Sequence, residues 1–394
     1  MNILMVLEGE YPSDNRVEKE VNSLINSGFN VDIACCTRKG LKKQEMVEGS
    51  MVYRKHISNF MSNKLSAVTL ILPFYFWFWK KFIQSLFNSK KYDVIHVHDL
   101  PLSKVGYFFK KKYNVKLVCD QHEYYSNWIV HTNHYNRGIG KIINWLSDWR
   151  AYERKYLHKA DLVITIEEPL RKCYLDEVGL PGEKVILVPN TPTLDIFNEN
   201  NVDEKIVDQY KNNFMIFYAG GIDKLRGLDL VIESLKILRN EVPSVKFVVA
   251  GRQARGFDIE YIARRHHVLN HVDFIGWIDI EKIPSYIAAS KIGVFTPPGN
   301  RDEIHNTIAT KIYQYMAMDT PVIVSDVKLM KEFVENNEIG VAVKNSEEFA
   351  SVVQKWSTDS ELYIKMKDNC KRIKKQYVWD HTIKQLVDFY KSID

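Results

Sequence analysis

A glycine-rich loop with two cationic side chains is the first segment of the sequence suited to chemistry. The apolar run Phe214–Tyr218 leads into Gly220 and Gly221, and Lys224 and Arg226 follow. Glycines after a strand let the backbone approach a ligand, and Lys or Arg can pair with phosphate. The loop favours phosphate binding, and a strand-ending turn with solvated cations is the alternative. No GxGxxG motif occurs here or after the first strand, which disfavours a Rossmann dehydrogenase.

A second strand-to-loop junction repeats this chemistry. The run Lys246–Ala250 ends in Gly251 and Arg252. A guanidinium group at the carboxyl edge of a sheet can bind a diphosphate through two parallel hydrogen bonds. The recurrence makes phosphate binding the better interpretation of both loops.

A third loop precedes an expected helix, Thr310–Met318. The unpaired amides at the start of a helix form an anion site, and we expect those near Thr307 and Ile308 to supply it. Asn306 or Thr307 is expected to cap the helix.

Two polar side chains of this helix lie on one face. Lys311 and Gln314 are three residues apart, and Asn306 lies eight residues before Gln314. If the helix extends to Asn306, Asn306 and Gln314 are about two turns apart and similarly oriented, which is about the span of a sugar nucleotide. The alternative for Gln314 is an exposed helix residue.

Histidines follow or occupy two strands of the first half. His96 and His98 alternate along one strand, whereas His122 follows the expected strand Lys116–Asp120. Zinc needs three or four ligands, and no Cys/His spacing supplies the remainder, so we predict no metal site. A hydrogen-bonded loop histidine is the alternative to a functional His122.

Short β-branched runs alternate with helical stretches along the chain, which predicts parallel sheets covered on both faces. The fold class is therefore α/β, with two doubly wound, Rossmann-like domains. A polar stretch at 191–212 separates residues 1–190 from a second series at 213–372. The expected strands are Ile3–Leu7, Asn30–Cys35, Asp93–His98, Lys116–Asp120, Leu162–Ile166, Lys184–Val188, Phe214–Tyr218, Lys246–Ala250, Val272–Ile275, Ile292–Phe295, Pro321–Ser325 and Gly340–Val343.

Basic residues are concentrated in the first domain. The net charge is only +5, yet Arg38–Leu117 holds 16 Lys or Arg and 4 Asp or Glu. This segment contains the uncharged run Leu65–Trp79, which is shorter than the ~20 residues of a spanning helix and is interrupted by Pro73. We expect either a core helix or an aromatic contact with an anionic bilayer. Nucleic-acid binding ranks last, because the lysines do not alternate with stacking aromatics.

The five cysteines are odd in number and show no CxxC motif, which indicates free thiols in a reducing compartment. The N-terminus lacks the features of a signal peptide. We expect a cytoplasmic protein, with a peripheral position at the inner face of the plasma membrane as an extension of the bilayer contact.

Residues 306–325 resemble the donor-site signature of family 4 (group 1) retaining glycosyltransferases of the GT-B fold, as found in bacterial polysaccharide biosynthesis. That signature reads E-x7-E followed by A-M-A-x-G-x-P-V-I. Here Asn306 and Gln314 replace the glutamates, and Asp319 replaces the glycine. Gly220–Gly227 is similar to the family's G-R-x4-K-G loop, with Arg226 at the lysine and Gly221 at the arginine. The resemblance covers nearly the whole chain; its other carriers are Phe274–Ile278, Pro12–Val17, Asp120–Glu123, Tyr377–Trp379 and Asp380–Tyr390.

The resemblance implies a role for each matching residue. Arg226, supported by Lys224 or Arg252 in place of the missing arginine, would neutralise a donor diphosphate. The segment around Ile278 would hold the base through its backbone, Gln314 the ribose, and Asn306 the transferred sugar. His122 would orient the donor, and Arg16 would lie near the acceptor. The family generally needs no metal, and residues 373–394 would cross back to the first, acceptor-side domain.

The implied reaction moves a hexosyl group from a nucleotide-diphosphate sugar to an acceptor hydroxyl, with retention and without a cofactor. The acceptor would be a growing cell-surface polysaccharide or a lipid-linked glycan. Two alternatives remain. A nucleotide-sugar 2-epimerase shares the fold, and a non-catalytic GT-B partner of another transferase is suggested by Asn306 and Gln314.

Overall fold

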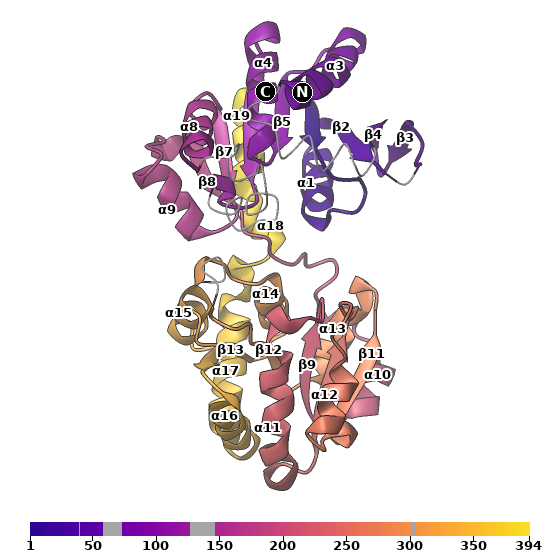
Figure 1. Ribbon diagram of the computed structural model, residues 1–394, viewed down its shortest axis with the longest axis vertical. Coiled ribbons are helices and arrows are strands. Elements are labelled where there is room, and N and C mark those ends of the chain that lie inside the picture. Colours follow the sequence, from indigo (N-terminus) through magenta and orange to yellow (C-terminus); the bar gives the residue numbers. More distant parts are fainter. Residues whose placement is uncertain (39, 58–72, 127–145, 301–304) are drawn as a thin grey trace. The chain divides into compact units, whose positions relative to one another are not determined.

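The computed structural model describes residues 1–38, 40–57, 73–126, 146–300 and 305–394. The chain divides into two compact units, one of Met1–Pro189 with Ile383–Asp394 and the other of Asn190–Thr382 (Figure 1). Residues 191–212, expected as a connection, and 373–382, expected to cross back, both belong to the second unit. The Trp379 amide donates to the Pro192 carbonyl at 2.8 Å, which joins these two segments.

The first unit is built on an eight-stranded sheet of order β3-β4-β2-β1-β5-β6-β7-β8. All its strand pairs are parallel except β3 with β4. The hairpin of β3 and β4 was not predicted. The strands are β1 (Asn2–Leu7), β2 (Asn30–Thr37), β3 (Gln44–Val47), β4 (Ser50–His56), β5 (Val94–His98), β6 (Lys116–Gln121), β7 (Leu162–Thr165) and β8 (Val185–Leu187).

Helices cover both faces of this sheet. Because side chains alternate along a strand, Ile95 and Val97 of β5 join the core under α3, α4 and α8, whereas His96 lies beneath Tyr390 of α19 on the other face. The C-terminal helix is therefore an integral part of the first unit. Its helices are α1 (Asn15–Asn26), α3 (Phe74–Ser89), α4 (Ser103–Tyr113), α8 (Leu146–Leu157), α9 (Glu168–Asp176) and α19 (Lys384–Ile393).

The apolar run expected over Leu65–Trp79 falls partly outside the described residues, which resume at residue 73. From Phe74 the run is helical. Tyr75 and Trp79 are buried one turn apart, as expected for a core helix, but Phe74 and Trp77 are exposed. The described part of the run therefore has a core face and an exposed aromatic face.

The second unit contains a wholly parallel six-stranded sheet of order β11-β10-β9-β12-β13-β14. The strands are β9 (Phe214–Ala219), β10 (Val245–Ala250), β11 (Val272–Gly276), β12 (Ile292–Phe295), β13 (Val322–Ser325) and β14 (Gly340–Val343). The helices are α10 (Glu204–Tyr210), α11 (Leu228–Glu241), α12 (Ile259–Arg265), α13 (Ile283–Ala289), α14 (Thr310–Ala317), α15 (Lys328–Asn336), α16 (Ser346–Thr358), α17 (Ser360–Ile373) and α18 (Trp379–Thr382).

Each sheet has one point where the strand order reverses. In the first unit it lies between β1 and β5, and in the second between β9 and β12. The carboxyl ends of the strands at such a point leave a crevice in which doubly wound folds bind ligands. The predicted α/β class with two doubly wound sheets is confirmed, and these two edges are where a site is expected. Within the described residues, no helix combines the length and the hydrophobicity needed to cross a membrane.

Candidate functional site

The loops after β9 and β12 meet closely at the reversal point of the second unit. Gly227 has φ +65°, and a Cβ atom there would lie 1.7 Å from the Thr296 carbonyl oxygen. The Thr296 hydroxyl in turn donates to the Gly227 carbonyl at 2.9 Å. Only glycine fits this junction, which fixes the start of α11 against the end of β12.

The ammonium group of Lys311 lies at this edge without a carboxylate partner in the described part of the chain. Its Nζ is 4.4 Å from the ring centroid of Phe295 and 5.1 Å from that of Tyr218. A Cβ atom on Gly220 would come within 3.3 Å of the same nitrogen, so the glycine leaves room beside it. The arrangement presents a cation next to accessible backbone.

Helix α14 holds Lys311 in place through the next turn. The Tyr315 ring packs directly over Gly293, where a Cβ atom would lie 2.2 Å from the ring. The Tyr315 hydroxyl donates to the Phe217 carbonyl at 3.0 Å, which ties α14 to β9. Gln314 lies three residues after Lys311 and is half-buried.

Burial, together with the nearby Arg226 guanidinium, lowers the pKa of Lys311 to about 7. Arg226 itself is held by Asp223, with Nε 3.6 Å from the carboxylate. Two cations therefore share this edge, and their mutual repulsion is relieved when an anion binds between them. Sequence reasoning assigned the diphosphate to Arg226 and missed the packing of the Lys311 side chain against two aromatic rings.

Helix α14 begins at the expected residue but lacks the expected cap. The helix begins at Thr310, its N-cap residue is Ala309, and no side chain caps it. Asn306 and Thr307 are thus not the cap, and Asn306 is exposed outside the helix. The two-turn relation between Asn306 and Gln314 required a helix that extends to Asn306, and this condition is not met, because the backbone at Ala309 is extended.

Arg252 lies at the end of β10, on the far side of the β9 loop. Its guanidinium stacks on Trp277, 4.7 Å from the ring centroid. The Ile222 amide donates to the Arg252 carbonyl at 3.0 Å, which joins the loops after β9 and β10. The Gly251 amide donates to the Gly276 carbonyl at 2.7 Å, which joins the ends of β10 and β11. The stacked side chains of Arg252 and Trp277 form a planar surface at the edge of the sheet, one residue before Ile278.

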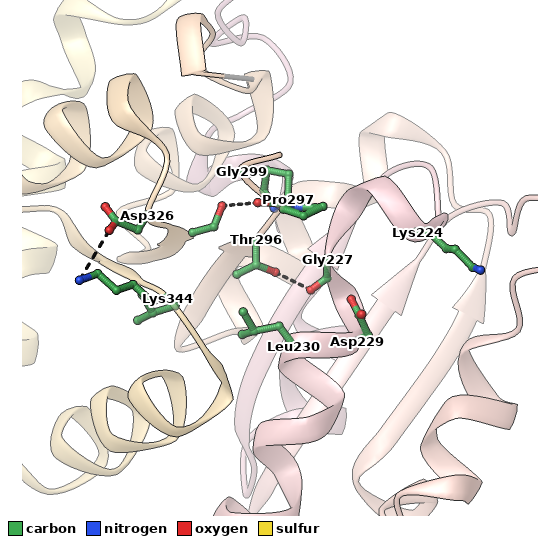
Figure 2. Close-up of a pocket in the computed structure, with 12 residues that line it drawn as sticks. Lys224, Gly227, Asp229, Leu230, Thr296, Pro297, Gly299, Asp326 and Lys344 are labelled. Atoms are coloured by element: carbon green, nitrogen blue, oxygen red, sulfur yellow. Dashed lines mark hydrogen bonds and ion pairs between the residues drawn. The ribbon is translucent and has the colours of Figure 1, made fainter. Parts of the chain in front are cut away.

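A cavity of about 480 Å³ opens on the other side of the β12 loop (Figure 2). Among the predicted site residues, only Lys224 lines it, and Figure 2 shows its side chain extending away from the other lining groups. Thr296, Ser325 and the Asp326–Lys344 ion pair form much of its wall. The cavity adjoins the Lys311 edge but does not contain Gly220, Gly221, Arg252, Ile278 or Gln314.

In the first unit, His122 lies at the carboxyl edge of β6. Its Nε2 is 3.0 Å from the Asp120 carboxylate and 3.3 Å from His98 Nδ1. Burial disfavours a charged imidazole, but the Asp120 carboxylate outweighs it and raises the pKa of His122 to about 9. His122 is therefore a cation at neutral pH.

Arg16 has a different place from the one expected. Its guanidinium is buried, bonded to both oxygens of Asp120 at 3.0 and 3.2 Å and to the Val188 carbonyl at 2.8 Å. It also lies 3.0 Å from the Glu20 carboxylate. All these partners are inside the first unit, so Arg16 holds Asp120 in position and is not available to an acceptor.

The same cluster holds the group of side chains best arranged for a metal ion in the described residues. One ligand atom from each of Glu20, His96, His98 and Asp120 lies within 4.8 Å of the others. The guanidinium of Arg16 already supplies positive charge there. Burial and the Asp120 carboxylate raise the pKa of Glu20 well above its usual range, which reduces the negative charge further.

Glu8 is a further polar group at the reversal point between β1 and β5. Its carboxylate accepts a hydrogen bond from the Tyr75 hydroxyl of α3. Burial raises the pKa of Glu8 to about 7. Sequence reasoning missed Glu8, although an acidic residue directly after a buried strand was the available signal.

Two family models match the chain, one over most of each unit. Residues 15–192 match the family described as Glycosyltransferase Family 4, and residues 200–373 match Glycosyl transferases group 1. The chain is a family 4 glycosyltransferase.

Similar proteins agree with this assignment. The glycosyltransferase is 21% identical to D-inositol 3-phosphate glycosyltransferase of Jonesia denitrificans, over 76% of this chain and 71% of the relative. It is 22% identical to alpha-galactosylglucosyldiacylglycerol synthase of Streptococcus pneumoniae, over 54% of this chain and 56% of the relative.

A solved structure shares the fold over the full length of the glycosyltransferase. Anabaena Alr3699/HepE in complex with UDP has a TM-score of 0.70 and 16% identity, covering 100% of both chains. The predicted GT-B fold is confirmed. The predicted reaction class, sugar transfer by a retaining family 4 enzyme from a nucleotide-sugar donor, is confirmed as well.

Proposed function

We propose that this glycosyltransferase moves a hexosyl group from a nucleotide-diphosphate sugar to an acceptor hydroxyl without a metal ion. The observation that carries the proposal is Lys311, a cation seated on aromatic rings beside Gly220. The charge of Arg226 is close enough to lower the pKa of Lys311. Such a pair suits a diphosphate, whose two charges bridge both cations.

We assign the donor contacts in the same way as the family resemblance implies, with Lys311 added. Lys311 and Arg226 bind the diphosphate, beside the backbone of Gly220 and Gly221. Thr307 and Ile308 precede the start of α14, so their amides are not the helix-start amides of the prediction. Gln314 accepts from the ribose, and Asn306 contacts the sugar. The platform of Arg252 on Trp277, with Ile278 beyond it, supports the base. Lys224 stays a second candidate for compensating the arginine that the family has at Gly221.

The chemistry requires charge stabilisation at the leaving group. The bond from the anomeric carbon to the diphosphate oxygen breaks, and a bond to the acceptor oxygen forms on the same face. The acceptor proton passes to the departing diphosphate. Lys311 and Arg226 stabilise the charge that develops there, and the cationic His122 orients the donor from the first unit. No described side chain has to act as a covalent nucleophile.

Donor binding and turnover test this proposal. UDP- and GDP-hexoses are screened by calorimetry, and the best donor is used in transfer assays. Arg226→Ala is expected to lower kcat roughly 100-fold, because one cation facing the leaving group is lost. Lys371→Ala, which removes an exposed lysine of α17, is the matched control. Absence of binding by every donor would instead favour a non-catalytic partner, and release of a free epimer would favour a 2-epimerase.

We propose metal independence because Lys311 and Arg226 supply positive charge at the donor edge. The cluster of Glu20, His96, His98 and Asp120 is buried and already contains the Arg16 guanidinium. We therefore expect EDTA to leave the transfer rate unchanged. A rate restored only by a divalent cation would contradict this part of the proposal.

For the acceptor, we propose a lipid-linked glycan or growing surface polysaccharide at the inner face of the plasma membrane. The relative from Streptococcus pneumoniae is named for a diacylglycerol glycolipid, which supports a lipid acceptor. A cytoplasmic location agrees with the free cysteines, four of which are buried. Transfer to a polyprenyl-diphosphate sugar but not to a soluble sugar would support this acceptor class, and the reverse would oppose it.

A further inference from the structure

Helices α3 and α4 of the first unit carry an unusual surface. The two helices lie side by side (Figure 1), and neither contains Asp or Glu. We call the following residues the aromatic–lysine face: Phe74, Phe76, Trp77, Lys80, Lys104, Phe108, Lys111 and Lys112.

Exposed rings mark the beginning of this face. Phe74 is 62% exposed and Trp77 55%, although Tyr75 and Trp79 on the same helix are almost completely buried. Exposing two large rings to water costs free energy that burial against a partner would recover. The core does not require these rings, so their exposure points to a partner outside the unit.

Lysine ammonium groups lie over the rings instead of pairing with carboxylates. Lys80 Nζ is 4.5 Å from the centroids of both Trp77 and Phe108, and Lys104 Nζ is 5.2 Å from that of Phe76. Within the described residues, neither lysine forms an ion pair. By contrast Lys110, on the same helix α4, lies 2.6 Å from the Asp161 carboxylate.

A shallow groove continues the face toward α8. It has a volume of about 490 Å³ and combines four lysines with four rings. Its lining residues are Phe76, Lys104, Tyr107, Phe108, Lys111, Lys112, Lys155 and Tyr156. An occupant must therefore offer apolar chains to the rings and negative charge to the ammonium groups.

The face adjoins the proposed acceptor edge. Helix α3 runs into β5, so its first turn lies at the carboxyl edge of the sheet, and the Tyr75 hydroxyl there donates to Glu8. A partner bound to Phe74 and Trp77 would lie beside the reversal point between β1 and β5.

We infer that the aromatic–lysine face docks on the surface of an anionic phospholipid bilayer. Trp and Phe enter the interfacial zone of a bilayer, while lysines remain at the level of the headgroups. Each lysine near an anionic surface contributes about 1 kcal/mol, which is roughly a fivefold gain in binding. A folded protein partner would match the rings but requires acidic side chains at fixed positions, and a nucleic acid would not need exposed Phe74 and Trp77.

This docking deepens the proposed lipid-linked acceptor, on which it rests for its purpose, but it is measured without any sugar transfer. The full chain is floated with vesicles of phosphatidylcholine alone or with vesicles in which roughly one lipid in three is phosphatidylglycerol. Binding is expected only to the anionic vesicles. Two double variants should each lower binding at least tenfold: Phe74→Ser/Trp77→Ser and Lys80→Glu/Lys111→Glu. For the lysine variant, this is on the order of two lost lysine contributions.

Matched controls separate this face from general stickiness and from donor binding. Tyr261→Ser/Ile364→Ser removes two exposed side chains of the second unit, and Lys367→Glu/Lys371→Glu reverses two lysines of α17. Neither control should change flotation, and all four variants should keep the donor affinity of the unmodified chain. Binding of the unmodified chain to neutral vesicles would overturn the inference. Equal binding by the two variants of the face and the two control variants would do the same. RNA that competes with vesicles equally well for the unmodified chain and for Phe74→Ser/Trp77→Ser would also overturn the inference, because the surface would then bind polyanions in general.

Discussion

At the residue scale, the central feature of the first unit is a chain of buried charges. Arg16 fixes both oxygens of Asp120, and Asp120 holds His122. Burial opposes the charge of Asp120, but Arg16 and His122 together keep the pKa of this carboxyl well below its usual range. Arg16 is thus a positioning residue, and its effect on His122 passes through Asp120.

The His122–Asp120 pair predicts a specific dependence of stability on pH. The pKa of His122 is raised from 6.5 to about 9 in the folded protein, so its contribution is complete below pH 6.5 and is lost as the pH rises to about 9. The shift corresponds to about 3 kcal/mol. Urea unfolding of the unmodified chain and of His122→Gln measures this contribution. It is carried out from about half a pH unit below to about half a pH unit above this titration range.

The pH profile distinguishes a charged pair from simple packing. In His122→Gln the decline over this pH range should disappear, because glutamine keeps a donor but does not titrate. A decline of the same size in both proteins would show that other groups cause it.

Lys311 predicts proton uptake on donor binding. Its pKa is lowered to about 7 by burial and by Arg226, so most of the free protein has a neutral Lys311 at pH values about one unit higher. A bound diphosphate restores the charge, and close to one proton should be taken up. Calorimetry in two buffers of different ionisation enthalpy measures this uptake.

Substitution of the same lysine provides the control. Lys311→Met should abolish the buffer dependence and weaken donor binding by about 10- to 100-fold, the value of a charge-assisted hydrogen bond. Equal binding heats in both buffers for the unmodified chain would contradict the assigned role.

At the scale of elements, buried parallel strands were the most predictable part of the fold. Strands such as β9 and β12 read as continuous apolar runs, because both faces are covered. The β3–β4 hairpin was missed, since β3 has only four residues and none of them is buried. The start of α14 at Thr310 was predicted correctly, but its expected cap, Asn306 or Thr307, was wrong, because no side chain caps this helix.

The site was predictable where its signals are local. Cations after glycine-containing loops pointed to Arg226 and Arg252, but the Arg16–Asp120 pair joins residues 104 positions apart and leaves no local pattern. Asp319 stands where the family has glycine, and its backbone has a φ of +56°. Glycine adopts this left-handed conformation without strain. Lys374, 2.8 Å from the Asp319 carboxylate, stabilises the side chain there.

The junction between the β9 and β12 loops predicts a strong effect of one methyl group. Gly227→Ala places Cβ 1.7 Å from the Thr296 carbonyl oxygen in a left-handed backbone, so the loops must separate. We expect a loss of roughly 2–4 kcal/mol in the free energy of unfolding. Gly221→Ala is the control, because a Cβ atom there meets nothing within 4 Å. Urea unfolding of both variants tests this, and equal stabilities would be inconsistent with the junction.

At the scale of the whole molecule, the first unit is assembled from two separate parts of the chain. Helix α19 contributes the buried side chains of Leu386 and Tyr390, and the Tyr390 hydroxyl lies 2.9 Å from His96 Nδ1. Both sheets are complete without further strands from the other unit.

Removal of Ile383–Asp394 is therefore expected to affect the two units unequally. The first unit should lose amide protection along β1 and β5, whereas β9, β12 and α14 should exchange as before. Hydrogen exchange followed by mass spectrometry reads this difference. Tyr390→Phe, which removes one hydrogen bond worth about 1 kcal/mol, should give a small change of the same kind. Equal loss of protection in both units would refute the division.

The return of α19 also orders the biosynthesis of the protein. A ribosome makes Ile383–Asp394 only after all of Asn190–Thr382, so the second unit can fold while the first still lacks a helix. Until then the face of His96 is uncovered in the nascent chain. The second unit can thus be complete before the first, and a translation product that stops before Ile383 would carry a finished second unit joined to a first unit that lacks α19.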